Sequence, residues 1–506
     1  MRRDLHRSAP FVISTLILIA WLDSPAAAQT AASPSPTVPD RSAESRVARA
    51  ADRARLEKLD VGWRTKDFAT IDAIFDEAWK TDRSWALESS HRLAVGEDTA
   101  ARPLGIAQLA LHVTPSELLK CLRGFDQSRA RAERRTLVML SLSALTTAPA
   151  ADARAVAAAL LADQDQVLRA AAATLAGVRQ DAALTEALLP LLRENPTFKP
   201  KWDGDEEDIL QSRAYGAFEA VWGVRPRSAN EAGALLRVTV PFKETPARGS
   251  NEPLDEPSAP APPLVSEPLR GRPYFPIRHF LINFEFGNDR TGGSEMARAV
   301  EAFAAPEWEA MIAAAEPVFG PLPIASPRLI IADRARYSSV GGNSFRPGSG
   351  TGNQIALLES VPDAMAATVR HECVHVLHGA SFERQPRWLS EGLAESLSIS
   401  TGGSVWTPQT IRERQFDDEL EKGVFTELLG WKGPASSGGR ESRLYAMAHL
   451  AVDFLRFGPH AAPHARLHLF MAKLGDHQSD RTTLERLYGG TVKEIDRALA
   501  DWVGGR

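Results

Sequence analysis

Residues 368–379 read TVRHECVHVLHG, with two histidines four positions apart and a glutamate directly after the first. On an α-helix such positions lie about 40° apart around the axis and about 6 Å apart along it, so His371 and His375 can bind one small cation. Glu372 points to one side of this pair, where its carboxylate can hydrogen-bond a water held by the cation. The pattern indicates metal-assisted hydrolysis, and the alternative is an amphipathic helix with a satisfied surface histidine.

A catalytic zinc ion needs three protein ligands and one open position, so a third ligand has to come from another segment. The segment PRWLSEGLAESLSIS, residues 386–400, carries its first glutamate sixteen residues after the second histidine. Pro386 allows the chain to turn back before this segment, and Trp388 offers an apolar contact that would fix a second helix against the first. Gly392 removes a side chain beside Glu391, and close helix packing is its alternative explanation.

The motif HECVH followed by WLSEGLAES resembles the gluzincin zinc metallopeptidases, in which the third ligand is a glutamate on the next helix. The resemblance implies that His371, His375 and Glu391 bind Zn2+. Glu372 is then the general base, and Glu395, four residues after the glutamate ligand, is an acidic partner that orients a ligand histidine. A structural zinc site fits this ligand set less well, because the set leaves one position open.

A hydrolytic site also needs a group that stabilises the oxyanion formed at the scissile carbonyl. The segment SRLYAMAHLAVDFLRFG, residues 442–458, places Tyr445 and His449 four positions apart on one helix face. It resembles the helix that follows the zinc site in bacterial peptidase-MA-like domains, where a tyrosine matches position 445. The resemblance makes Tyr445 the preferred donor over a merely packed tyrosine, with His449 as the second candidate.

The resemblance covers roughly residues 277–503 and departs from the family at one strand. Related aminopeptidases hold a free amino terminus with a G-x-M-E-N strand, whereas the matching segment here reads GNQIALLES, residues 352–360. We therefore expect an endopeptidase rather than an exopeptidase. This strand could pair with an extended substrate by β-augmentation.

The surrounding segments predict the elements that position these residues. RHFLINFEF alternates like a strand, and PRLIIAD and NQIALLE are short β-rich runs. AVEAFAAPEWEAMIAAAEPVFG predicts a helix that ends at Gly320, and the helix with both histidines should lie against the sheet. Residues 277–506 thus predict a zincin-like domain with a small sheet and active-site helices, and the fold class of the chain is α+β.

Residues 46–239 predict an all-α domain, because apolar residues recur at helical spacing. TPSELLKCL carries a capping box, with Thr114 as N-cap, Pro115 at the first helical position and Glu117 at the third. Two similar helical hairpins follow between residues 132 and 193 with a period of about 31 to 34 residues, which resembles HEAT-type repeats. An irregular helical bundle is the alternative.

The remaining segments predict connections and export. The Pro-rich stretch 240–276 excludes a helix or a central strand and predicts a linker between the two domains. Residues 1–28 combine a basic start, a short apolar run and small residues, which predicts a cleavable signal peptide, with an uncleaved anchor as the alternative. Residues 29–45 are rich in Ser, Pro and Ala and predict a disordered tether. We therefore expect an exported protein, periplasmic or secreted.

Composition limits the partners of the chain. The net charge of −5 gives no reason to expect nucleic acid as a partner. No segment after residue 28 approaches the roughly 18 apolar residues of a membrane span, so no integral membrane association is expected. The two cysteines, Cys121 and Cys373, fall in different predicted domains, which argues against a disulfide. Cys373 points away from the histidine face, so we expect a buried and inert thiol.

Together these patterns predict a zinc metallopeptidase that hydrolyses peptide or protein substrates through a metal-bound water. The alternative is a helical-repeat module that binds a partner protein and carries a catalytically silent peptidase-like domain. The complete HECVH motif and Glu391 favour the enzyme, since a silent domain has no reason to keep Glu372.

Overall fold

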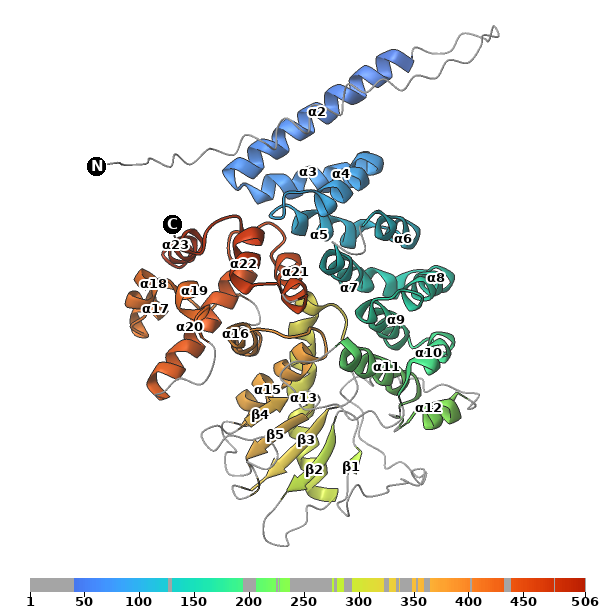
Figure 1. Ribbon diagram of the computed structural model, residues 1–506, viewed down its shortest axis with the longest axis vertical. Coiled ribbons are helices and arrows are strands. Elements are labelled where there is room, and N and C mark those ends of the chain that lie inside the picture. Colours follow the sequence, from blue (N-terminus) through green and yellow to red (C-terminus); the bar gives the residue numbers. More distant parts are fainter. Residues whose placement is uncertain are drawn as a thin grey trace, which may run out of the picture. The chain divides into compact units, whose positions relative to one another are not determined.

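The structure is a computed structural model, and it divides into two units, Met1–Lys58 and Leu59–Arg506, each described by itself (Figure 1). The predicted signal peptide and most of the predicted tether and linker lie outside the described residues. The residues described are 41–125, 130–193, 206–223, 226, 228–236, 275–276, 280–285, 294–322, 327–333, 336, 348–351, 354–358, 365–400, 403–431, 438–476 and 478–505.

The first described element is the helix α2 (Arg41–Thr65). Its first residues, 41–45, belong to the segment that the sequence pattern predicts as tether. Pro39 is the last proline before the helix, and the residues that follow are rich in Ala, Arg and Glu, which are strong helix formers. The change in composition at Pro39, rather than at Arg46, explains where the helix begins.

The larger unit begins with a series of short helices that follow one another in a stacked array (Figure 1). The predicted capping box is present at the start of α6, where Thr114 and Glu117 each accept a hydrogen bond from the other's backbone N–H. The helices of this array are α3 (Phe68–Thr81), α4 (Arg83–Val95), α5 (Arg102–His112), α6 (Pro115–Gly124), α7 (Arg131–Thr147), α8 (Ala150–Leu161), α9 (Gln166–Val178), α10 (Ala182–Leu188), the 3-10 helix η1 (Leu189–Leu191), α11 (Glu206–Trp222) and α12 (Ala229–Leu235).

The segments predicted as two hairpins form α7 and α8, and α9 and α10, and polar contacts join α9 to α7. Asp165 caps the N-terminus of α9 and accepts two hydrogen bonds from the Arg135 guanidinium of α7, at 2.7 and 3.0 Å. At the other end of α9, Arg179 donates to three carbonyl oxygens between residues 145 and 148, at the end of α7. Polar contacts at both ends of α9 thus join this helix to α7.

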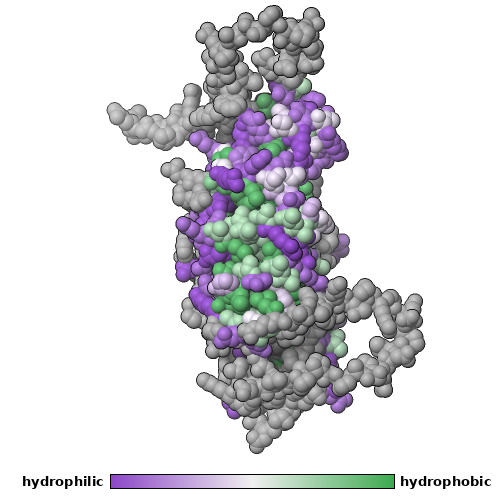
Figure 2. All heavy atoms as spheres, turned by 90° about the vertical axis from the view of Figure 1, so that its right-hand side faces the viewer, coloured by the Kyte–Doolittle hydropathy of each residue, from purple (hydrophilic) through white to green (hydrophobic). Residues whose placement is uncertain are grey.

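The outer side of the array is apolar over several helices. Figure 2 shows hydrophobic side chains gathered over the face that carries α8 and α10. Leu111, near the end of α5, is 71% exposed. The exposed alanines of α8 are Ala150, Ala151, Ala155, Ala158 and Ala159.

A five-stranded sheet with the order β1-β2-β3-β5-β4 follows in the second half of the chain. The strands β2, β3 and β5 run parallel, and β1 and β4 pair antiparallel at the two edges. Helices make up most of the described residues, with this one small sheet, so the α+β class is confirmed. The strands are β1 (Phe275–Pro276), β2 (Leu281–Glu285), β3 (Arg328–Ala332), β4 (Gly348–Thr351) and β5 (Gln354–Leu358).

All three predicted strands are present, as β2, β3 and β5, but β5 is not at an edge. It pairs with β3 on one side, from Arg328↔Gln354 to Ala332↔Leu358, and with β4 on the other. The expectation that this strand adds an extended peptide is therefore wrong, because both of its hydrogen-bonding sides are occupied. Among the described strands, β4 is the edge next to it.

The helix α13 (Ser294–Phe319) ends at Gly320, as predicted. Gly320 has a φ of +76°, in the left-handed region that terminates helices and that glycine adopts without strain. A Cβ atom at this position would lie 2.6 Å from the carbonyl oxygen of Met139 in α7. The glycine thus allows the end of α13 to approach the helical array at backbone distance.

The histidine helix α15 (Met365–Gly379) contacts β4 and β5, as predicted for a helix against the sheet. The next helix, α16 (Arg387–Ile399), begins after Pro386. None of the described helices has the length and hydropathy needed to cross a bilayer. The later helices are α17 (Pro408–Glu413), α18 (Asp417–Lys422), α19 (Val424–Leu428), α20 (Gly438–Phe457), α21 (Pro463–Gly475), α22 (Asp480–Tyr488) and α23 (Val492–Val503).

Close packing fixes α16 among these later helices. A Cβ atom at Gly392 would lie 2.5 Å from the carbonyl oxygen of Ala448, so the glycine allows α16 to touch the backbone of α20. On another side, the buried ring of Trp388 meets Phe425 of α19 and Phe470 of α21, with ring centres 5.9 and 6.1 Å apart. The helix that carries the predicted third ligand is therefore held by backbone and by aromatic contacts.

The helical array and the C-terminal region share one hydrophobic core within the larger unit. Leu137 and Met139 of α7 belong to the same buried cluster as Phe319 and Phe382. The helix α21 contacts both α5 and α7. The two predicted domains therefore pack together, although a Pro-rich stretch separates them in the sequence.

Candidate metal centre

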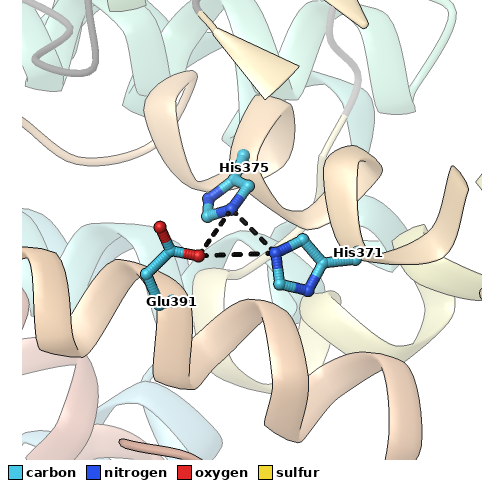
Figure 3. A group of neighbouring side chains, drawn as sticks. All are labelled: His371, His375 and Glu391. Carbon is cyan, nitrogen blue, oxygen red and sulfur yellow. Dashed lines mark hydrogen bonds and ion pairs between the residues drawn. The ribbon is translucent and has the colours of Figure 1, made fainter. Parts of the chain in front are cut away.

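The side chains of His371, His375 and Glu391 converge on one point between α15 and α16 (Figure 3). The Nε2 atoms of the two histidines lie 3.2 Å apart, and Oε2 of Glu391 lies 3.4 Å from each of them. The Glu391 side chain is 1% exposed and that of His375 is 5% exposed, while the His371 side chain is 16% exposed. The centre is therefore closed on the side of Glu391 and more open on the side of His371.

The spacing of these three atoms fits a small tetrahedral cation. A zinc ion with ligand distances of about 2.0–2.2 Å places neighbouring ligand atoms about 3.3–3.6 Å apart. The observed separations of 3.2, 3.4 and 3.4 Å match one face of such a tetrahedron. Two imidazole nitrogens with one carboxylate oxygen are also a donor set that zinc prefers. The group could therefore hold a zinc ion and leave a fourth position for another molecule.

Each of the three side chains has a second polar partner, and α16 supplies all of these partners. Glu395 Oε1 lies 3.3 Å from Nδ1 of His371, and Ser390 Oγ lies 3.2 Å from Nδ1 of His375. An Nδ1–H group that donates to these oxygens leaves the Nε2 lone pair of each ring directed at the centre. The position of Glu395 agrees with the role that the resemblance implies for it.

The third partner is Arg387, one helical turn before Glu391. Its Nε lies 3.7 Å from Oε1 of Glu391, the carboxylate oxygen that faces away from the histidines. The guanidinium also donates to Glu441 at 2.8 Å and stacks on the Trp431 ring, 5.0 Å from the ring centre. Glu391 is thus oriented by a cation that is itself held from two sides.

Electrostatics around His371 favour positive charge at the centre. Burial lowers the pKa of His371, but hydrogen bonds to Glu391 and Glu395 and the nearby charge of Glu372 outweigh this effect and raise the pKa to about 10. Burial raises the pKa of Glu391, but its contacts with His371 and His375 outweigh burial and hold the pKa well below its usual range. These carboxylates therefore favour a positive charge at the centre, which a proton or a metal ion can supply.

Glu372, the predicted general base, lies next to His371 in α15 and is only 6% exposed. In the part of the chain that the structure describes, its carboxylate makes no hydrogen bond or ion pair. A buried carboxylate without such a partner is costly to desolvate, and a site that binds water or substrate compensates for that cost. The environment of Glu372 differs in this respect from that of Glu395, which binds His371.

Tyr445, the preferred oxyanion donor, lies beside the centre. Its hydroxyl accepts a hydrogen bond from Nη2 of Arg387 at 3.4 Å, and the same Arg387 side chain contacts Glu391. The tyrosine ring packs edge-on against Trp431, with ring centres 5.4 Å apart. Tyr445 is thus connected to Glu391 through one intervening side chain, Arg387.

His449, the second candidate donor, belongs to a different group of side chains. It is 2% exposed, and its Nε2 lies 2.9 Å from Oγ of Ser400 and 3.5 Å from the Asp453 carboxylate. Asp453 also accepts hydrogen bonds from Ser396 and Ser404. These contacts join the end of α16 to α20, so His449 takes part in holding α16 in place.

Two side chains at the centre have no place in the sequence prediction, namely Arg387 and Ser390. The spacing of Arg387, four residues before Glu391, puts it on the same helix face and could have indicated it. Ser390 carries no such signal, because its contact depends on how α16 lies against α15. Cys373 is fully buried, as predicted, and burial raises the pKa of its thiol well above the usual value.

Comparisons of the chain with models of known protein families, with curated proteins and with solved structures find no match.

Proposed function

We propose that this protein is a zinc-dependent peptidase. The observation that carries the proposal is the triangle formed by His371, His375 and Glu391, with edges of 3.2, 3.4 and 3.4 Å. Three ligands with an open fourth position are typical of catalytic rather than structural zinc. The carboxylate of Glu372, on the same helix as both histidines, adds a group that can move a proton.

Zinc bound by these ligands would act as a Lewis acid on the scissile carbonyl and lower the pKa of water. Glu372 would accept a proton from the attacking water and donate it to the leaving amine. The Tyr445 hydroxyl would donate a hydrogen bond to the developing oxyanion, a position that its link to Arg387 restricts. Glu395 and Ser390 would keep the two imidazoles in the tautomer that presents Nε2.

We propose an extended peptide or protein as the substrate and endopeptidase activity rather than exopeptidase activity. The strand β4, the edge of the sheet beside β5, contacts the histidine helix α15. A peptide that pairs with this edge would run past the ligand helix and be held by backbone hydrogen bonds, without recognition of a terminus.

Cleavage of a mixed peptide library by the purified full-length chain tests the proposal. The protein is assayed as purified, after treatment with a chelator, and after zinc is added back, with metal content measured each time. We expect about one zinc ion per chain and cleavage that chelation abolishes and zinc restores. Cleavage that persists in fully metal-free protein would contradict the proposal.

A second candidate function is a helical-repeat module that binds another protein, with the zinc domain catalytically silent. The apolar outer face of the array in Figure 2 favours this alternative, since helical-repeat arrays bind partners over extended surfaces. Zinc content separates the two functions: substoichiometric metal in a folded protein supports the module, and stoichiometric metal supports the enzyme.

We further propose that the helical array is HEAT-like, that residues 277–506 form a gluzincin-like domain, and that the protein is exported to the periplasm or the medium. The contacts of Asp165 and Arg179 between successive hairpins support the first point. The pattern of residues 1–28 supports export. Mass spectrometry of the mature amino terminus tests the export proposal.

A further inference from the structure

The turn between the two ligand helices, residues 380–386, is held by a buried arginine of the helical array. Arg213 of α11 is 1% exposed. Its Nε donates to the carbonyl oxygen of Ala380 at 3.2 Å, its Nη2 to Oγ of Ser381 at 2.8 Å, and its Nη1 to the carbonyl oxygen of Pro321 at 3.1 Å. All three nitrogens of the guanidinium are thus engaged by the C-terminal half of the chain.

These acceptors lie at the ends of two helices. Ala380 directly follows α15, and Pro321 follows α13 after Gly320. The last carbonyl groups of a helix lack partners within the helix and carry partial negative charge. Arg213 therefore caps the end of α15 and ties it to the segment that follows α13. Burial lowers its pKa to about 9, so the guanidinium stays charged at neutral pH.

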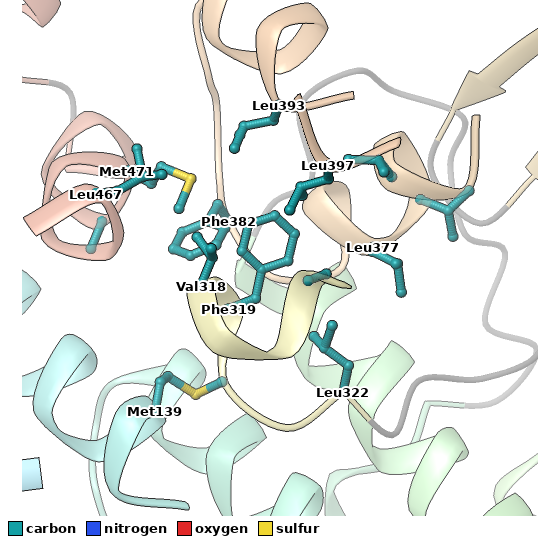
Figure 4. Close-up of a cluster of buried hydrophobic side chains, with 14 of the residues drawn as sticks. Met139, Val318, Phe319, Leu322, Leu377, Phe382, Leu393, Leu397, Leu467 and Met471 are labelled. Atoms are coloured by element: carbon teal, nitrogen blue, oxygen red, sulfur yellow. The ribbon is translucent and has the colours of Figure 1, made fainter. Parts of the chain in front are cut away.

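A second arginine of the array holds the next part of the same turn. Nη1 of Arg135 in α7 donates to Oε1 of Glu383 at 2.9 Å, while its other nitrogens bind Asp165. Between the two contacts, the ring of Phe382 packs on Phe319 at the end of α13, with ring centres 5.4 Å apart (Figure 4). The turn is thus held by the array at residues 380, 381 and 383.

This turn joins the two helices that carry the proposed metal ligands. The histidines lie on α15 before it and Glu391 lies on α16 after it. A rotation of α16 about the turn would change the distances from Glu391 Oε2 to both Nε2 atoms. These ligand distances tolerate only a few tenths of an ångström in a working zinc site.

We propose that Arg213 and Arg135 are positioning residues for the metal centre, through which the helical array sets the angle between α15 and α16. The inference rests on the proposed zinc site. It makes the array a structural part of that site, whatever partner its outer face binds.

The test compares zinc affinity and the folded state of full-length Arg213→Met and Arg213→Lys with the wild-type protein. Lysine keeps the charge but cannot reach three acceptors in one plane. Arg154→Met is the matched control, because Arg154 is a half-exposed arginine of the array that binds Asp181 and does not touch the turn. Chelator competition gives the zinc affinity, and the visible spectrum of cobalt-substituted protein reports the ligand geometry.

We expect Arg213→Met to bind zinc about 10-fold more weakly. This is near the lower end of the loss of metal affinity that follows when a residue that positions a metal ligand is mutated. Its cobalt spectrum should change, and Arg213→Lys should be intermediate, while Arg154→Met should match the wild-type protein. Folded Arg213→Met with wild-type zinc affinity and an unchanged cobalt spectrum would show the inference to be wrong.

Two further outcomes also test the inference. If Arg213→Met does not fold, Arg213→Lys and Glu383→Gln provide the same measurements, because Glu383→Gln weakens the Arg135 contact from the side of the turn. Wild-type affinity in both would contradict the inference. Wild-type protein that binds no zinc would overturn the proposed function first, and the inference with it.

Discussion

Glu395 Oε1 lies 3.3 Å from Nδ1 of His371, on the side of the ring opposite the Nε2 that faces Glu391. The two glutamates stand four residues apart on α16 and approach the same imidazole from its two nitrogens. Glu391 is placed to share a cation with the His371 ring, and Glu395 is placed to orient that ring. This division makes their substitution effects separable.

Glu395→Gln should weaken zinc binding by about 10- to 100-fold, because the amide is a weaker acceptor for the His371 Nδ1–H. Metal affinity measured by chelator competition checks this. Glu421→Gln, the same change at an exposed glutamate of α18, serves as control and should leave the affinity unchanged. Equal affinities in both variants would mean that Glu395 does not support the ligand.

Glu372→Gln should keep the metal and lose turnover by a factor of about 100 or more, since the amide cannot accept the proton. Zinc content and peptide cleavage are measured on the same preparation. A variant that retains zinc and cleaves at the wild-type rate would exclude Glu372 as the general base.

Tyr445→Phe should lower kcat by about 10²- to 10³-fold with little change in KM, the usual effect of removing an oxyanion donor. Zinc affinity and the unfolding temperature should stay close to wild type, since the ring still packs on Trp431. His449→Gln is the comparison. If it lowers kcat in a folded protein while Tyr445→Phe does not, the roles of the two residues are reversed.

Gly392→Ala should lower the free energy of unfolding by about 1–3 kcal/mol, because the added methyl group would overlap the Ala448 carbonyl oxygen and push α16 from α20. Chemical denaturation measures this loss. Gly379→Ala, at the end of α15, is the matched control, because no atom lies within 4 Å of its added Cβ. If Gly379→Ala lowers the free energy of unfolding by as much as Gly392→Ala, the packing of α16 on α20 is not the cause of the loss.

Asp165→Asn should lower the free energy of unfolding at neutral pH by about 2–4 kcal/mol, because Arg135 loses its buried carboxylate partner. Burial raises the pKa of Asp165, but Arg135 and Arg131 outweigh it and hold the pKa below its usual value. A lowered folded-state pKa adds stability above the unfolded pKa of about 4, and this stability disappears as the pH falls through the folded value. The difference in the free energy of unfolding between wild type and Asp165→Asn should therefore shrink at acidic pH. Chemical denaturation of both proteins at neutral and at acidic pH checks this expectation.

The sequence alone determined the features that depend on spacing along one element. The separation of His371 and His375 on a single helix, the capping box at Thr114 and the end of α13 at Gly320 all follow from the helical repeat and from backbone preferences. The same holds for the three strands, whose apolar runs mark them without knowledge of their neighbours.

Only the tertiary structure decided which elements meet. The order of the strands puts β5 inside the sheet and β4 at its edge, although neither segment indicates in its sequence which strand it pairs with. Ser390 reaches His375 only because of the way α16 lies on α15. Arg213 contacts Ala380, 167 positions further along the chain, because burial of apolar surface brings the helical array against the turn between α15 and α16. Contacts between distant segments depend on the packing of whole elements, and no local spacing encodes that packing.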